Sequence, residues 1–182
     1  MIVYHGSIRK FHHFENETVV QKKLPNDIDT IGTWFTSDIH SSKPFALGTE
    51  TVIEKSDTEF WEDGEPKVVQ YDKPVQGYVY KVYVGEPHIK DFESYNLFME
   101  ERDKYCDYLG KKRNITWLDK AILLNKEEAN KALRQKLINH AYAGFVIRNM
   151  NLDGKTTDLY CFFGEDILQI ADVIPVPVDS ID

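Results

Sequence analysis

Tyr4-His5-Gly6-Ser7 ends the strand-like run that opens the chain, and two later stretches belong with it. These are Gly32-Thr33-Trp34-Phe35-Thr36-Ser37-Asp38 and Asp158-Leu159-Tyr160-Cys161-Phe162-Phe163. Each stretch contains a short run of β-branched and aromatic residues, which is typical of a strand. The glycine that follows His5 lets another group approach the backbone closely. We therefore expect three short strands, one from each stretch.

The rest of the sequence predicts a strand, then a group of helices, then further strands. Gly77-Tyr78-Val79-Tyr80-Lys81-Val82-Tyr83-Val84 is the clearest strand, because every position but the first and fifth is aromatic or β-branched. Further strands are expected over 144–148 and 167–176, and 151–155 is a turn. Apolar residues at helical spacing predict helices over 92–109 and 126–142, and a short helix is expected over 117–124. Strands followed by helices and then by strands favour an α+β fold.

Composition limits the class of protein. The chain has 182 residues, which fits a single domain over 1–182. Its net charge of −8 argues against broad, non-specific nucleic-acid binding, because phosphate contacts need a basic surface. Cys106 and Cys161 form no CxxC pair, and two isolated cysteines are more common in a reducing compartment. The N-terminus does not resemble a signal peptide, and we find no run of about 20 apolar residues, so we expect a cytoplasmic protein without a membrane partner.

A helix is expected just after the second stretch. Ser37 or Asp38 can cap it, and Pro44 keeps it short or kinked before about Leu47. With Ser42 and Phe45 in this segment, the three stretches together resemble the His-Tyr-Glu class of ADP-ribosyltransferases. That class includes diphtheria toxin, the poly(ADP-ribose) polymerases and many phage-encoded relatives. The resemblance spans nearly the whole chain and leaves out 48–75 and 85–125, as insertions or flanking helical elements.

The resemblance implies an NAD site built from the first strand and the segment after the second strand. His5 would bind the adenosine ribose, while the Gly6 backbone and Ser42 would bind the nicotinamide carboxamide. Trp34 and Phe45 would contact the nicotinamide ring, both in place of tyrosines that are usual in the family. Ser7 completes the signature of the first strand and is grouped with the NAD-binding residues. The implied fold has two small packed antiparallel β-sheets around an NAD cleft, with flanking helices.

The family's catalytic glutamate corresponds to Asp158, one methylene shorter. A carboxylate there would stabilise the positive charge that builds up on the ribose as the bond to nicotinamide breaks. Glu165, past the end of the same strand, is the rival carboxylate. No metal is expected to be needed, because nicotinamide leaves as a neutral molecule, and His12-His13 has no companion ligands at metal-binding spacing.

Ordinary structural roles remain alternatives for these residues. His5 would then be a strand-end residue, Trp34 and Phe45 core aromatics, Ser42 a serine on a helix surface and Asp158 a turn residue. The acidic run 54–66 is expected to be a solvated loop. Arg148 is expected to form a salt bridge at a strand edge, with a pyrophosphate contact as the sharper alternative.

Three functions follow from the resemblance. The first is a mono-ADP-ribosyltransferase that uses NAD to modify a macromolecular target, either a protein or a nucleic acid. The second is a binding module that has lost catalytic strength, holds NAD or ADP-ribose and acts through a protein partner. The third is an RNA 2′-phosphotransferase, which relies on basic residues that this acidic chain lacks in number. A toxin or phage factor of this kind would also have a cognate antitoxin or inhibitor as a partner.

Overall fold

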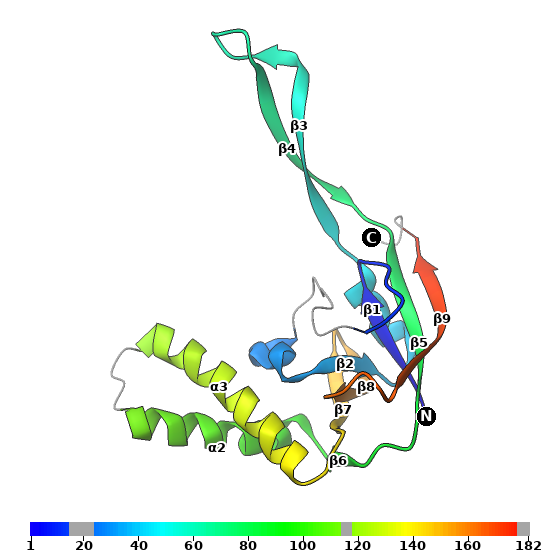
Figure 1. The fold of residues 1–182 in the computed structure, drawn as a ribbon, viewed down its shortest axis with the longest axis vertical. Coiled ribbons are helices and arrows are strands. Elements are labelled where there is room, and N and C mark those ends of the chain that lie inside the picture. Colours follow the sequence, from blue (N-terminus) through cyan, green and yellow to red (C-terminus); the bar gives the residue numbers. More distant parts are fainter. Residues whose placement is uncertain (15–23, 114–117, 178–182) are drawn as a thin grey trace.

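The computed structural model describes residues 1–14, 24–113 and 118–177. Most of its strands form one seven-stranded mixed sheet in the order β6-β7-β8-β2-β1-β5-β9 (Figure 1). Its strands are β1 (Ile2–Ser7), β2 (Thr33–Thr36), β5 (Gly77–Val84), β6 (Ile89–Phe92), β7 (Gly144–Leu152), β8 (Lys155–Phe162) and β9 (Leu168–Val176). β6 and β7 are parallel, and the other neighbours are antiparallel. The α+β class expected from the sequence is therefore confirmed.

The large sheet is nearly divided in two between β1 and β2. β1 pairs with β5 along its whole length, but it pairs with β2 only through Tyr4 and Thr36. β2 instead continues along β8, and in Figure 1 it runs across the direction of β1 and β5. A single residue pair still joins the two halves into one sheet, so the expected pair of small packed sheets is not seen as two separate sheets.

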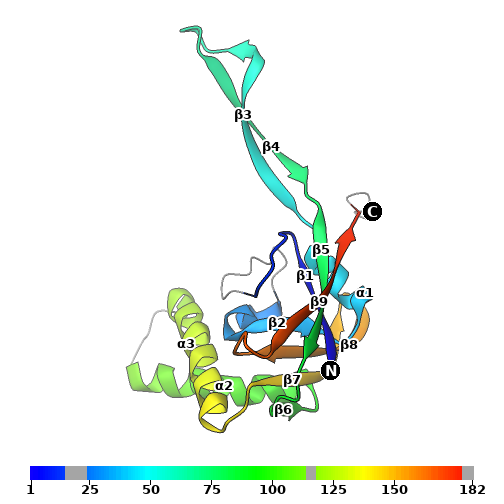
Figure 2. The same cartoon turned by 45° about the vertical axis from the view of Figure 1, so that its right-hand side comes forward.

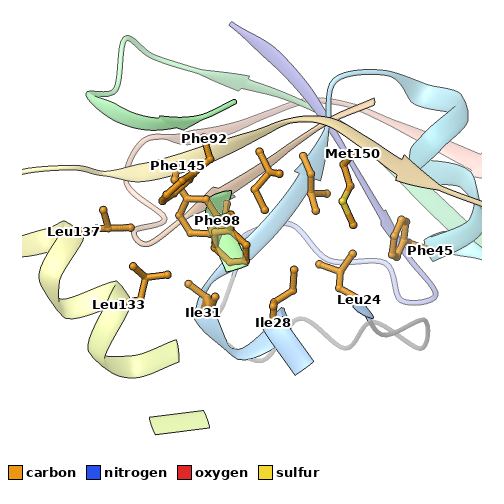
Figure 3. Packing of buried hydrophobic residues seen from close by; sticks show 13 residues of the cluster. Leu24, Ile28, Ile31, Phe45, Phe92, Phe98, Leu133, Leu137, Phe145 and Met150 are labelled. Carbon is orange, nitrogen blue, oxygen red and sulfur yellow. The ribbon is translucent and has the colours of Figure 1, made fainter. Parts of the chain in front are cut away.

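Helices cover one face of the β6-β7-β8-β2 half. They are η1 (Pro25–Ile31), α2 (Tyr95–Arg113) and α3 (Leu118–Asn139). Figure 3 shows Leu133 and Leu137 of α3, Phe98 of α2 and Ile28 and Ile31 of η1 directed toward the sheet residue Phe145. Each large apolar side chain buried in this way contributes roughly 1.5–3 kcal/mol. The short helix expected over 117–124 was wrong as a separate element, because 118–124 continue into α3 without a break, while residue 117 lies outside the described part of the chain.

The segment after β2 forms two short helices, α1 (Ile39–Ser42) and η2 (Lys43–Ala46). The Asp38 carboxylate accepts a hydrogen bond from the Ser41 amide at 2.9 Å, so Asp38 is the N-cap. Pro44 lies in the first turn of η2, where the helix changes from α to 3-10, as its effect on helices predicts. A Cβ on Gly77 would lie 1.6 Å from the Ala46 carbonyl oxygen, so this glycine lets η2 pack directly on β5.

Residues 48–75, expected as a weakly patterned insertion with a solvated loop at 54–66, form a long β-hairpin. β3 (Thr49–Phe60) and β4 (Pro66–Pro74) pair with each other and with no other strand of the described residues. Figures 1 and 2 show the hairpin projecting away from the rest of the molecule. The loop interpretation was wrong because both faces of the hairpin meet solvent, so the sequence lacks the alternation of apolar and polar residues that marks a half-buried strand.

The turn between β7 and β8 forms as expected. Leu152 pairs with Lys155, and Asp153 and Gly154 between them have φ values of 52° and 80°. Positive φ at both central residues is the geometry of the two-residue hairpin turn that Asp-Gly favours. β6, which sequence patterns did not predict, forms by parallel pairing with β7. Within the described residues, no helix has the length and apolar character needed to span a membrane.

Candidate functional site

His5 lies where the sheet divides, and its side chain bridges the gap. Its Nδ1 is 2.8 Å from the carbonyl oxygen of Trp34 on β2. A carbonyl oxygen can only accept, so Nδ1 carries the proton and Nε2 is left as an acceptor in the neutral ring. Nε2 is buried and has no hydrogen-bond partner among the described residues. His5 thus presents one unused acceptor beside the gap between β1 and β2.

Aromatic rings surround the imidazole of His5. The ring centroids of Phe14, Phe35, Phe11 and Tyr80 lie 5.3, 5.5, 6.1 and 6.3 Å from it. Burial in this apolar environment lowers the pKa of His5 from its ordinary value of 6.5 to about 4, although the hydrogen bond to Trp34 opposes the shift. The side chain is therefore neutral at physiological pH.

Two of these rings, Phe11 and Phe14, come from the segment that follows β1. The Tyr80 hydroxyl accepts a hydrogen bond from the Phe11 amide at 2.7 Å and donates one to the Arg9 carbonyl at 3.1 Å. The rings of Phe11 and Tyr80 are stacked with centroids 4.0 Å apart. Phe11 and Phe14 therefore pack against the buried imidazole of His5. The closure of Phe11 and Phe14 over His5 could not be predicted from the local sequence pattern.

Gly6 brings the α1–η2 segment against β1. A Cβ on Gly6 would lie 2.2 Å from the Ser42 carbonyl oxygen and 2.9 Å from Cβ of Phe45, so only glycine fits here. The structure therefore brings Gly6, Ser42 and Phe45 together. Ser42 is fully buried, and its hydroxyl donates to the Ile39 carbonyl at 2.8 Å. Phe45 belongs to the main apolar cluster, beside Leu24 and Met150 in Figure 3, and its stacking on nicotinamide stays a prediction.

Trp34 and Ser7 both have partners within the chain. The Trp34 indole donates to the Asp29 carbonyl at 3.3 Å and meets Phe145 edge-on with ring centroids 5.4 Å apart. The Ser7 hydroxyl is buried and accepts from the Arg9 amide at 3.1 Å. Contacts of Trp34 and Ser7 with NAD also stay predictions.

The expected site residues occupy the two faces of the sheet. Tyr4, Thr36 and Leu159 lie in one row of paired residues, and paired residues share a face. Side chains alternate along a strand, so His5 and Asp158 lie on the opposite face from this row. Gly6 and Trp34 lie on the same face as the row. These two groups of residues meet only at the division between β1 and β2.

Asp158 lies opposite a β-bulge. Ile147 pairs with Leu159 and Met150 pairs with Thr157, so Arg148 and Asn149 together face Asp158. Asn149 has a φ of 54°, which is uncommon for a non-glycine residue. Its amide donates to Oδ1 of Asp158 at 3.1 Å. The bulge therefore holds the carboxylate in a fixed direction.

Arg148 links two carboxylates from different strands. Its Nη1 donates to Oδ2 of Asp158 at 2.7 Å. Its Nε and Nη2 bind Asp91 of β6, the shortest distance being 2.6 Å. Hydrogen bonds to Asp91 and then to Asp158 raise the pKa of Arg148, so it stays charged. The expected salt bridge of Arg148 is confirmed, while Asp91 and Asn149 are members of this cluster that sequence reasoning missed.

The alternative residues lie away from this cluster. Glu165 follows the end of β8, in the turn to β9, where its carbonyl accepts from the Leu168 amide at 2.9 Å. His12 and His13 are exposed. In the part of the chain that the structure describes, no three His, Cys, Asp or Glu side chains gather as a metal site. Cys161 is buried as a free thiol in the apolar cluster.

Comparison with known proteins gives no relative: no family model matches the chain, and no curated protein or solved structure matches it.

Proposed function

We propose that the protein is an NAD-dependent mono-ADP-ribosyltransferase that transfers ADP-ribose to a macromolecular target and releases nicotinamide. The observation that carries this proposal is the position of His5, with an unused, buried acceptor at the division between β1 and β2. The finer fold expected from the resemblance, two sheets around an NAD cleft, is part of the same proposal and is supported by that division.

The residues at the division fit the two ends of NAD. Nε2 of His5 can accept a hydrogen bond from a ribose hydroxyl. Gly6 and Ser42 are already adjacent, as a shared contact with the carboxamide requires. Beyond the single pair at Tyr4, the edge of β1 that faces β2 has no ladder partner in β2. Backbone groups on that edge can therefore bind a polar ligand.

Asp158 is the catalytic residue in this proposal. When the bond between ribose and nicotinamide breaks, both bonding electrons leave with nicotinamide and positive charge develops on the ribose. The Asp158 carboxylate would stabilise that charge, and a nucleophilic group of the target would then bond to the ribose carbon and lose its proton. Asp91 binds Arg148 through three hydrogen bonds, so the cluster of two carboxylates and one guanidinium keeps one net negative charge.

One observation favours the binding-module alternative. Both oxygens of the Asp158 carboxylate already accept hydrogen bonds, one from Arg148 and one from Asn149. A carboxylate held in this way is less available to an incoming nucleophile. NAD or ADP-ribose would then bind without efficient cleavage, and the protein would act through a partner.

NAD binding is the first test of the proposal. Calorimetry with NAD should detect binding at millimolar ligand or below. His5→Ala should weaken binding by about 1–3 kcal/mol, because the ligand loses a buried hydrogen-bond partner. His40→Ala is the matched control, since His40 is exposed on α1 and should leave the affinity unchanged. Absence of NAD binding in a sample with a cooperative thermal transition would sink the proposal.

The hairpin should not be needed for NAD binding. Replacing residues 55–68 by Asn-Gly joins the paired residues Glu54 and Val69 through a two-residue turn. Because β3 and β4 pair only with each other within the described chain, the affinity for NAD should stay within about twofold of the full-length value. Calorimetry on the shortened protein measures this, and loss of NAD binding with the thermal transition intact would contradict it.

A further inference from the structure

The β3–β4 hairpin exposes apolar side chains that no other part of the described chain covers. Ile53 is 67% exposed, Val68 60%, Trp61 59% and Phe60 54%. A two-stranded hairpin alone is only marginally stable in water. Apolar side chains gathered on an exposed surface often mark a site of contact with another molecule. Its twelve-residue strand β3 reaches roughly 40 Å at about 3.3 Å per residue. The length and exposure indicate an arm that meets another molecule.

The charge of the arm shows which kind of molecule fits. Residues 49–74 contain eight Asp and Glu and three Lys, so they carry −5 of the chain's net −8. Glu59, Glu62, Asp63 and Glu65 surround Phe60 and Trp61 at the tip. A nucleic acid or a second copy of this acidic arm would be repelled, whereas lysine and arginine side chains would be attracted.

At the tip, one lysine of the chain itself contacts both a carboxylate and an aromatic ring. Nζ of Lys67 lies 3.3 Å from Oε2 of Glu59 and 5.6 Å from the centre of the Trp61 ring. The turn is ordered by backbone hydrogen bonds between Trp61 and Glu65 and between Gly64 and Trp61. Trp61 and Glu59 therefore form a surface on which a cation is stable, and the other carboxylates of the tip extend it.

The arm is also attached beside the candidate site. β3 begins three residues after Ala46, and β4 leads into β5 through Val75, whose amide donates to the Gly48 carbonyl at 3.1 Å. Gly77 at the start of β5 packs on Ala46, the residue after Phe45. A molecule that extends from the tip of the arm to its base would therefore reach the segment that carries Ser42 and Phe45.

We infer that the arm is a docking surface for a basic protein with exposed apolar side chains, and that this protein is the acceptor of ADP-ribose. The docking surface is argued from the arm alone, while the identification of the docked protein as the ADP-ribose acceptor rests on the proposed function. The inference favours a protein over a nucleic acid as the target.

Binding measured without NAD tests the docking surface. The probe is a fluorescent twenty-residue peptide in which arginine and lysine alternate with leucine, titrated with the full chain at 150 mM salt. A matched peptide with glutamate in place of the basic residues and a twenty-nucleotide single-stranded RNA are the negative probes. We expect the basic peptide to bind and the other two to show no binding.

Two variants of equal charge separate the arm from general electrostatic attraction. The tip variant is E59Q, E62Q, D63N and E65Q, and the body variant is E86Q, E93Q, E100Q and D172N, at four exposed positions. The tip variant should bind the basic peptide about tenfold or more weakly, while the body variant should change the affinity by less than about threefold. Trp61→Ala, which keeps the charge, should also weaken binding several-fold.

Three results would overturn the docking surface: no binding of the basic peptide, an equal loss in the tip and body variants, or tip-dependent binding of the RNA. Because NAD is absent, none of these results bears on NAD binding. Conversely, a protein that binds the peptide through its tip but fails to bind NAD would retain the arm and lose the proposed function.

Discussion

Asp158→Asn should lower the rate of NAD cleavage by roughly 10²–10⁴-fold, because the carboxylate acts on charge that develops in the transition state. The affinity for NAD should change little, since ground-state binding depends on other groups. Asparagine keeps the size of the side chain and still accepts from the Asn149 amide, and Arg148 keeps its partner Asp91. Nicotinamide release, measured chromatographically, gives the rate, and calorimetry gives the affinity.

Glu165→Gln is the matched control for this experiment. Glu165 lies seven residues after Asp158, and the strand from Asp158 to Phe162 alone spans roughly 13 Å at about 3.3 Å per residue, so we do not expect both carboxylates to serve the same ribose. The structure places it after the end of β8, away from Arg148 and the bulge. Its substitution should leave the rate nearly normal. Loss of activity in Glu165→Gln with a normal rate in Asp158→Asn would place the reaction at the far end of β8. Full activity in both variants would contradict catalysis by a carboxylate of this strand.

The binding-module alternative predicts a different result for Asp158→Asn, because the wild-type protein would itself cleave NAD slowly. If NAD binds but nicotinamide release is no faster in the wild type than in Asp158→Asn, the binding module is correct. The two hydrogen bonds that hold the Asp158 carboxylate then explain why it does not act on the ribose.

Local chemistry made several elements predictable. β5 begins and ends at the expected residues, Gly77 and Val84, because its aromatic and β-branched run is bounded by glycine at both ends. Thr33–Thr36 forms β2 and Asp38 caps the following helix, as short-range preferences indicate. These features depend on neighbours a few residues apart, which the sequence shows directly.

Features that depend on distant pairing were not predictable in the same way. β6 has four residues and exists through its ladder with β7, more than fifty residues later. The bulge at Arg148 and Asn149 is set by the register between β7 and β8, which no local pattern reveals. The division of the sheet arises because β1 follows β5 while β2 follows β8, and this difference in long-range pairing could not be foreseen from the sequence.

The stability of the protein should fall as the pH drops from 7 to 4.5, and His5 should account for roughly 2–3 kcal/mol of that loss. In the unfolded chain His5 takes up a proton near pH 6.5, whereas in the folded protein burial lowers its pKa to about 4. The unfolded state therefore binds more protons between these values. The stabilisation is fully present above about pH 6.5 and is lost as the pH falls toward 4.

His5→Gln removes the titration while its amide can still donate to the Trp34 carbonyl. Urea unfolding of the wild type and of this variant at pH 7 and at pH 4.5 should show a smaller pH effect in the variant by roughly 2–3 kcal/mol. Carboxylates whose pKa is lowered in the folded state, such as Glu101 beside Lys136 and Lys104, contribute equally to both proteins and cancel in the comparison. His40→Gln, at an exposed position, should keep the wild-type pH dependence. An unchanged pH dependence in His5→Gln would show that His5 is not held neutral beneath Phe11 and Phe14, and its Nε2 would then not be the acceptor on which NAD binding depends.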